Sequence, residues 1–217
     1  MQDFQRDFLD FALTHEIIRF GEFKLKSGRI SPYFFNSGLF NTGASLRRVG
    51  ESYAAAIMHS GVAFDALFGP AYKGIPLVAA TVIALAARFE RSVPYCFDRK
   101  EAKDHGEGGV IVGAPPRGRV LIVDDVISAG ASVNHSVEVI RNAGAVPAGV
   151  VIALDRQERG QTSQYSAVAE VEQRFNIPVI AIVRLEHLVI YLEGQPGMSA
   201  ALASIMSYKG CYGAVAA

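Results

Sequence analysis

Apolar and polar residues repeat with two different periods along the chain, and the change of period marks the predicted elements. Apolar residues at helical spacing predict helices over residues 4–18, 43–61, 74–89, 133–142, 163–175, 185–192 and 198–208. Short apolar runs predict strands over residues 22–25, 32–36, 65–69, 93–97, 120–123, 146–154 and 179–183. From residue 65 onward these strands and helices alternate, except for a polar segment over residues 99–117. The alternation is typical of an α/β fold in which a parallel sheet is covered by helices on both faces.

The two ends of the chain do not follow this alternation. Within a single domain spanning residues 1–217, we expect residues 43–184 to form the core and residues 1–42 and 185–217 to form a small hood lobe. Ligands of open α/β sheets bind at the carboxyl ends of the strands, so a lobe placed there would cap the site. The tail over residues 210–217 resembles no segment of known role and is expected to be frayed.

Composition narrows the class of protein. The chain has 217 residues, 50% of them hydrophobic, which suits one domain with a large core. Its formal net charge is zero, which argues against general nucleic-acid binding. The apolar run over residues 75–87 contains Pro and Thr and is too short to cross a bilayer. Cys96 and Cys211 show neither metal-ligand nor disulfide spacing, and no export signal is visible, so we expect a cytoplasmic protein.

The most informative stretch follows the apolar run at residues 120–123, where Asp124 and Asp125 precede a small-residue turn over 128–132. Small residues let backbone N–H groups converge on an anion at the start of the next helix, and Ser128 and Ser132 add hydroxyl donors. The carboxylates would repel a phosphate, so we expect them to face ribose hydroxyls of the same ligand. The stretch predicts a site for a 5-phosphorylated ribose. The P-loop and dinucleotide motifs are missing, which weakens those two readings.

This stretch, V-L-I-V-D-D-V-I-S-A-G-A-S, resembles the phosphoribosyl-pyrophosphate (PRPP) binding motif of the type I phosphoribosyltransferases. Other stretches along most of the chain resemble the bacterial orotate phosphoribosyltransferases. The resemblance implies the parallel-sheet core of that family with a hood that reads the base. It assigns PRPP binding to Asp124, Asp125, Val126, Ile127, Ser128, Ala129, Gly130, Ala131 and Ser132. It also gives Asp125 a catalytic role and places Ser128, where close relatives have Thr, near orotate.

A second strand end, over residues 69–74, carries small residues and a lysine at the start of a helix. Such a turn can bind a diphosphate, or it can be an ordinary turn with Lys73 in solvent. The matching loop of the family holds the pyrophosphate of PRPP. The resemblance therefore adds these residues to the PRPP site: Ala71, Tyr72, Lys73 and Gly74.

The polar stretch over residues 98–109 contains Arg99, Lys100, Lys103 and His105. By composition it is a solvated loop; if it closes over a leaving diphosphate, excluding water strengthens each cation. The stretch resembles the mobile catalytic loop of orotate phosphoribosyltransferases. That resemblance implies PRPP binding by all four residues and catalytic roles for Lys103 and His105. It also implies a homodimer in which the 99–109 loop reaches into the neighbouring subunit's site.

The base-binding residues are expected from the first strands and from the end of the 146–154 strand. Paired phenylalanines such as Phe34 and Phe35 are usually core residues, but the resemblance implies that they border a flat pyrimidine. It also implies that Lys26 meets the negative charge of PRPP and orotate. Arg156 is either a surface cation or, by resemblance, the group that grips the orotate carboxylate through two hydrogen bonds.

The expected activity is transfer of the phosphoribosyl group from PRPP to orotate. We expect no metal held by the protein itself; Mg²⁺ would arrive with PRPP and lie near Asp124 and Asp125 through water. Two alternatives stay open. A phosphoribosyltransferase for another base would keep the 124–132 motif and have a different hood, and a PRPP-sensing regulator would bind nucleic acid without catalysis.

Overall fold

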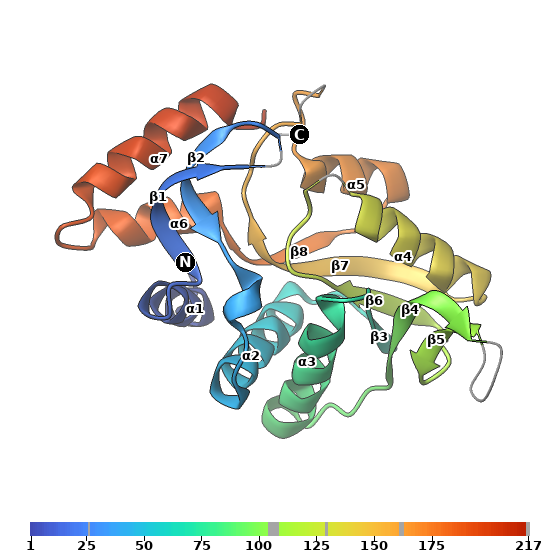
Figure 1. Ribbon diagram of the computed structural model, residues 1–217. Helices are drawn as coiled ribbons and strands as arrows, with labels where there is room; N and C mark the ends of the chain where they lie inside the picture. Colours follow the sequence, from blue (N-terminus) through green and yellow to red (C-terminus); the bar gives the residue numbers. More distant parts are fainter. Residues whose placement is uncertain (26, 104–108, 129, 161–162, 216–217) are drawn as a thin grey trace.

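The computed structural model describes residues 1–25, 27–103, 109–128, 130–160 and 163–215 of the chain. Its main feature is a six-stranded sheet of order β5-β4-β3-β6-β7-β8, with a separate two-stranded sheet, β1–β2, beside it (Figure 1). The strands of the large sheet are β3 (Ala66–Gly69), β4 (Tyr95–Lys103), β5 (Gly109–Gly113), β6 (Arg119–Val123), β7 (Val146–Asp155) and β8 (Val179–Arg184).

Neighbouring strands are parallel except for β4 and β5, so the prediction of a parallel sheet is confirmed with one correction at its edge. The polar segment 99–117 is partly strand: β4 continues to Lys103 and pairs antiparallel with β5 through Phe97↔Val112 and Asp98↔Ile111. Charged residues dominate this end of β4, and the β-branched run in β5 is short, so the apolar pattern gave no strand signal.

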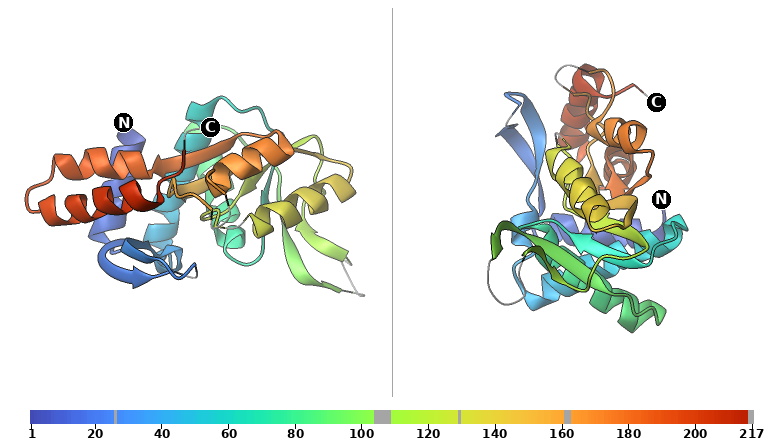
Figure 2. Two further views of the ribbon diagram at one scale, coloured as in Figure 1. Left: turned by 90° about the horizontal axis from the view of Figure 1, so that it is seen from above. Right: turned by 90° about the vertical axis from the view of Figure 1, so that its right-hand side faces the viewer.

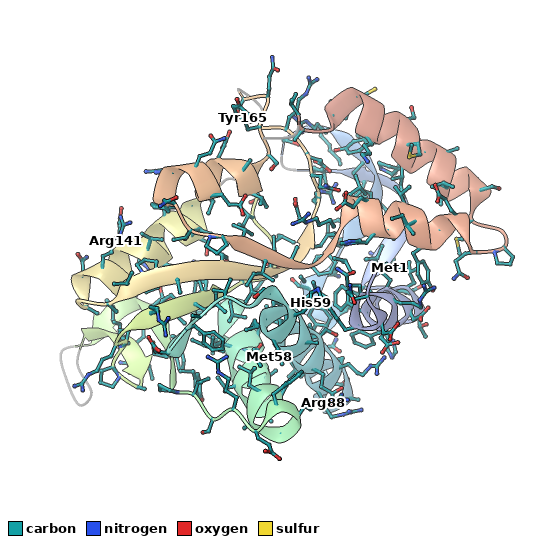
Figure 3. The ribbon with its side chains drawn as sticks, turned by 180° about the vertical axis from the view of Figure 1, so that it is seen from behind. Met1, Met58, His59, Arg88, Arg141 and Tyr165 are labelled. Carbon is teal, nitrogen blue, oxygen red and sulfur yellow. The ribbon has the colours of Figure 1, made fainter. Side chains whose placement is uncertain are left out.

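Helices cover both faces of the sheet because its central strands are apolar on both sides. In β6, Leu121 and Val123 face the core cluster under α1 (Asp3–Thr14), α2 (Gly43–Ser60) and α3 (Gly74–Phe89). Val120 and Ile122 face the second cluster, under α4 (Ala131–Asn142) and α5 (Ala167–Phe175). Arg88 on α3 and Arg141 on α4 mark the two outer surfaces (Figure 3). The predicted layering is confirmed.

Elements from the two ends of the chain lie together at one end of the sheet (Figure 2). They are β1 (Ile18–Lys24), β2 (Ile30–Phe35), η1 (Ser37–Leu39), α6 (Leu185–Glu193) and α7 (Ser199–Tyr212), with α7 packed on α6 and β2. The first helix ends four residues earlier than predicted: Glu16 has a φ of 55° and reverses the chain, so Ile18 pairs with Phe35 instead. The predicted helix over 163–175 starts only at Ala167, after its cap Ser166.

The described part of the tail, up to Val215, is bound rather than frayed, contrary to the prediction. Gly213 forms an antiparallel bridge with Glu158, the Ala214 N–H donates to the Gln157 carbonyl at 2.9 Å, and the Val215 N–H donates to the Gln164 carbonyl at 3.2 Å. These bonds use main-chain groups, which a side-chain pattern does not reveal.

Among the helices of the described residues, none combines the length and apolar character needed for a bilayer span.

Candidate active site

The candidate site lies where the strand order reverses. The chain runs outward from β3 to β4 on one side and from β6 through β7 to β8 on the other. The loops that leave β3 and β6 therefore diverge toward α3 and α4, on opposite faces of the sheet (Figure 1). A crevice at such a switch point is the usual ligand site of an open α/β sheet.

Asp124 and Asp125 are held at this point by continued pairing with β7. The Asp124 N–H donates to the Val151 carbonyl at 3.0 Å, and the Asp125 carbonyl accepts from the Ala153 N–H at 2.9 Å. Oδ1 of Asp124 accepts from the Asp125 N–H at 2.9 Å, and its Oδ2 accepts from the Ser132 hydroxyl at 2.8 Å. Both carboxylates are only 6% exposed, and the structure brings them together with Ser132 as the sequence predicted.

Burial changes the ionisation of this pair. It raises the pKa of Asp124 to about 6; the Ser132 hydrogen bond opposes that shift and the charge of Asp125 adds to it. Tyr53 of α2 lies beneath and donates its hydroxyl to the Asp124 carbonyl at 2.7 Å. Burial raises the pKa of Tyr53 well above 10, so this hydroxyl stays protonated and remains a donor.

Asp125 joins two segments that are distant in sequence. Its Oδ2 accepts from Nζ of Lys73 at 2.7 Å and from the Ser37 hydroxyl at 2.5 Å. Lys73 is therefore directed to the carboxylate and is not an unpartnered solvent cation. A hollow of about 240 Å³ opens beside this contact, lined by Ser37, Gly38, Phe40, Leu46, Tyr72, Lys73, Pro76 and Leu77. Nothing in the sequence pattern marked Ser37, which sits in η1 after β2.

The turn after Asp125 ends in a helix N-terminus that faces the crevice. Val126 packs on one core cluster and Ile127 on the other, which anchors the turn from both sides of the sheet. Gly130 has a φ of 68°, a conformation that glycine adopts without strain, and its carbonyl accepts the first helical bond from the Asn134 N–H. The first N–H groups of a helix have no intrahelical acceptor, so this end can bind an anion. Ala129 lies outside the described residues.

The loop after β3 lies tightly against the end of β6. A Cβ on Gly74 would stand 2.8 Å from the Val123 carbonyl oxygen, so only glycine lets α3 begin there. Tyr72 is exposed, and Nζ of Lys100 lies 5.0 Å from its ring centroid, which brings β4 to this loop. Nη1 of Arg99 is buried and has no hydrogen-bond partner among the described residues. Lys103 ends β4, but its side chain, His105 and Lys26 lie outside the described part.

Arg156, just after β7, is a half-buried group that its neighbours orient. Its Nε donates to Glu158 at 2.8 Å, its Nη2 donates to the Ser31 hydroxyl at 2.9 Å, and its guanidinium lies 4.2 Å from the ring centroid of Tyr33. Glu158 also contacts Nη2 at 2.6 Å. Within the described residues these partners occupy Nε and Nη2 and leave Nη1 for a ligand. The reading of Arg156 as a surface cation is thereby set aside, and its three partners gave no signal in the sequence.

Phe34 and Phe35 point to opposite faces of β2, as consecutive strand residues do. Phe35 packs against the main core cluster and Phe40, whereas Phe34 stacks on Phe23 with ring centroids 5.5 Å apart. At most one of the two rings can therefore face a given ligand, and Phe34 is the one outside the core.

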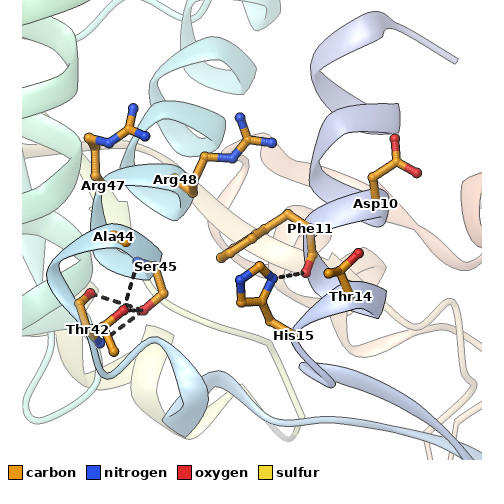
Figure 4. Close-up of a pocket in the computed structure, with 9 residues that line it drawn as sticks. All are labelled: Asp10, Phe11, Thr14, His15, Thr42, Ala44, Ser45, Arg47 and Arg48. Atoms are coloured by element: carbon orange, nitrogen blue, oxygen red, sulfur yellow. Dashed lines mark hydrogen bonds between the residues drawn. The ribbon is translucent and has the colours of Figure 1, made fainter.

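A second hollow, of about 300 Å³, lies between α1 and the start of α2 (Figure 4). It is lined by Asp10, Phe11, Thr14, His15, Thr42, Ala44, Ser45, Arg47 and Arg48. None of the described hydrogen bonds or ion pairs of Asp124 and Asp125 involves these residues, and none of them was predicted as a site residue. The chemistry therefore concentrates at the strand ends.

Comparison with known proteins agrees with this geometry. Residues 37–181 match the family described as the phosphoribosyl transferase domain. The chain is 58% identical over 213 residues to the orotate phosphoribosyltransferase of Cellvibrio japonicus, covering 98% of this chain and 99% of the relative. It is 59% identical to that of Thiobacillus denitrificans, covering 98% and 100%. The crystal structure of the Francisella tularensis orotate phosphoribosyltransferase has a TM-score of 0.87 at 45% identity, covering 96% of this chain and all of the other.

Proposed function

Because this chain belongs to the phosphoribosyltransferase family, we propose that it is an orotate phosphoribosyltransferase. It transfers the 5-phosphoribosyl group of PRPP to orotate and forms orotidine 5′-phosphate and pyrophosphate, a step of pyrimidine biosynthesis. The observation that carries this proposal is the buried pair Asp124 and Asp125 between the starts of two helices. It occurs in a chain that shares 58% of its residues with a relative of that name over nearly its full length.

Each part of PRPP has a matching feature at the strand ends. The turn over 126–132 and the start of α4 offer N–H groups to the 5′-phosphate, while the Ser132 hydroxyl donates to Asp124. Asp124 and Asp125 accept hydrogen bonds from the ribose hydroxyls. We assign the diphosphate to the loop before α3 and to the cations named by the family resemblance: Ala71, Tyr72, Lys73, Gly74, Lys26, Arg99, Lys100, Lys103 and His105.

The reaction needs orientation and charge stabilisation more than covalent help from the protein. A ring nitrogen of ionised orotate attacks C1 of the ribose as the diphosphate leaves from the opposite face, through a loose, oxocarbenium-like sugar. Holding both partners in line lowers the entropic part of the barrier. Lys73 and the β4 cations stabilise the departing diphosphate, and the charge of Asp125 favours the positive sugar. Exclusion of water by the 99–109 loop protects PRPP from hydrolysis.

Orotate lies on the side of the hood. Nη1 of Arg156, left open by Glu158 and Ser31, binds its carboxylate. Phe34 and Ser128 border the pyrimidine, with Lys26 nearby as a counter-charge, whereas Phe35 belongs to the core. This part of the site decides which base is accepted.

Mg²⁺ fits this site as an ion that PRPP carries in. Within the described residues no group of three or more His, Cys, Asp or Glu side chains is arranged around a metal position. Oδ2 of Asp125 is already shared by Lys73 and Ser37. Magnesium usually keeps several waters and is bound by one or two carboxylates together with substrate phosphates. Asp124 and Asp125 would hold it through water, and the bound ion supplies positive charge to the diphosphate.

We further propose a cytoplasmic homodimer in which the 99–109 loop serves the neighbouring site. Lys100, in the same segment, is exposed on β4, as a residue that meets a neighbouring subunit has to be. The position of β4 and β5 at the edge of the sheet supports the same view (Figure 1). Cys96 and Cys211 are both free thiols, as in proteins of a reducing compartment.

The activity is tested by incubating the protein with orotate, PRPP and Mg²⁺ and following the loss of orotate absorbance. Turnover that depends on all three supports the assignment. Turnover with adenine and none with orotate would indicate a different base, and salt-dependent binding of RNA or DNA without pyrophosphate release would indicate a regulator.

The catalytic role of Lys103, in the 99–109 loop, is tested separately. Lys103→Ala should lower kcat by about a hundredfold or more, and an unchanged kcat would reject that role.

A further inference from the structure

Asp98 is a buried carboxylate that the mechanism above does not use. It lies on β4 directly before the cations Arg99 and Lys100, and it is only 3% exposed. Besides Asp124 and Asp125, it is the one buried carboxylate in the described part of the chain. Burying a charge is costly unless partners compensate it, so the contacts of Asp98 indicate what it is for.

Each oxygen of Asp98 holds a different segment of the site. Oδ1 accepts from the Ala71 N–H at 2.5 Å, and Oδ2 lies 2.8 Å from Nε2 of His135, a hydrogen bond that places the ring proton on Nε2. Ala71 opens the loop that ends in Lys73. His135 lies on α4, one turn after its first residue, Ala131. One carboxylate thus joins β4 to the start of both helices that face the crevice.

The two contacts fix a distance within the site. The bond to Ala71 sets the orientation of the loop assigned to the diphosphate. The bond to His135 ties that loop to α4, which its own buried apolar residues hold on the sheet. His135 also places a hydrogen-bond donor on a carboxylate whose charge would otherwise repel the nearby phosphates. Its side chain is 57% exposed, so it covers Asp98 from the solvent side.

We propose that Asp98 and His135 are positioning residues that hold the diphosphate loop at a set spacing from the phosphate-binding turn. This rests on the proposed function, because it concerns a ligand with phosphate groups at both ends of a ribose. The pair acts through Ala71 and α4 and touches no reacting atom. The ligands differ in which of these segments they contact. PRPP contacts both the loop before α3 and the phosphate-binding turn. Pyrophosphate contacts the loop before α3, and orotidine 5′-phosphate contacts the turn and the hood.

The test compares Asp98→Ala with the parent and with Asp65→Ala. Asp65 is a matched control because it also accepts a backbone N–H, that of Arg119 at 2.8 Å, and pairs with a cation, but at the opposite ends of the strands. Asp98→Ala should raise the KM for PRPP and the Kd for pyrophosphate about tenfold, while the Kd for orotidine 5′-phosphate changes by less than about twofold. Asp65→Ala should change none of the three.

Two further variants keep the test decisive if Asp98→Ala does not fold. Asp98→Asn retains an acceptor for the Ala71 N–H and can donate to the ring of neutral His135, so it should stay within about threefold of the parent. His135→Ala, at an exposed position, should raise the KM for PRPP about threefold. Equal weakening of all three ligands, or an unchanged Kd for pyrophosphate in both Asp98→Ala and His135→Ala, would overturn the proposal. Calorimetric binding of pyrophosphate needs no orotate turnover, so failure of the proposed function would be seen separately.

Discussion

The two halves of the site are assembled in different ways. The strand-end half consists of residues 71–74 and 124–132, and the base half consists of Ser31, Tyr33, Arg156 and Glu158. In the strand-end half the side chain of Asp124 bonds to Asp125 and Ser132, one and eight residues away, and the more distant Ser37 and Lys73 then bond to Asp125. In the base half, Arg156 bonds to Ser31, 125 residues earlier in the chain.

This difference separates two kinds of function. The strand-end half depends on the geometry of a strand that ends at a helix, and it binds a phosphorylated ribose whatever the base. The base half depends on how β2 from the N-terminal part meets the segment after β7. Changes in the first half should therefore act on kcat and PRPP, and changes in the second on orotate. The predictions below test that division.

The largest effect is expected from Asp125→Ala. This change removes the acceptor of Lys73 and Ser37 and the charge that favours the positive sugar. We expect kcat/KM for PRPP to fall by about 10² to 10³, in line with other losses of charge-stabilising groups. Steady-state kinetics with each substrate varied in turn measures it. Asp65→Ala serves as the control, and a loss confined to the KM for orotate would break the division between the halves.

The next effect is on stability and has a defined pH dependence. Burial raises the pKa of Asp124 from 3.8 to about 6, so its contribution to folding is complete below pH 3.8 and is lost as pH rises through about 6. In Asp124→Asn the amide oxygen still accepts from the Asp125 N–H, the amide NH2 can donate to the Ser132 hydroxyl oxygen, and there is no charge to bury. We expect the variant to be more stable at pH 8, on the order of 2 kcal/mol, with lower activity.

Thermal unfolding measured from pH 4 to pH 8 checks this prediction. The gain in Tm should be about 5 °C at pH 8 and should vanish near pH 4, where the parent carboxyl is protonated too. A gain that is the same at every pH would show that it does not come from removing a buried charge. A loss of Tm at pH 8 would show that its charge is well compensated.

The features that the sequence alone predicted are mostly those of the strand-end half. The apolar run over 120–123 and the residues after it predicted the central strand, the acidic pair and Ser132, because buried strands and tight turns leave a local pattern. The parallel core and the two covering layers follow from the alternation of strands and helices. These are features that neighbouring residues determine among themselves.

What the sequence did not reveal depends on tertiary contacts. Ser37 meets Asp125 only because η1 lies over the strand ends, and Asp98 meets His135 only because β4 and α4 converge there. Glu158 carries no pattern that marks it as the partner of Arg156. The continuation of β4 and the bound tail depend on main-chain pairing. The local periodicity of apolar residues does not predict such tertiary contacts. In the base half, only the family resemblance indicated that Arg156 binds the ligand.

A smaller effect is expected from Arg156→Lys, in the base half. Lysine keeps the positive charge but carries its three donors on one nitrogen instead of a planar fork, so it cannot match the positions of Glu158, Ser31 and a carboxylate together. We expect the KM for orotate to rise about tenfold, with the KM for PRPP within about twofold of the parent. Initial rates at saturating PRPP and varied orotate measure it. A parallel rise in the KM for PRPP would mean that the halves are coupled.

The smallest effect, and the sharpest probe of the base half, is Ser31→Ala. The Ser31 hydroxyl is fully buried, donates to the Tyr33 carbonyl at 2.7 Å and accepts from Nη2 of Arg156 at 2.9 Å. Removing it leaves Glu158 and the Tyr33 ring to orient the guanidinium. Because one hydrogen bond to a charged group is lost without direct contact to PRPP, we expect only the KM for orotate to rise, by about threefold. In Ser31→Thr the hydroxyl remains and should restore the parent value if the pocket admits the methyl group. A fall in kcat with an unchanged KM for orotate would place Ser31 with the strand-end half instead.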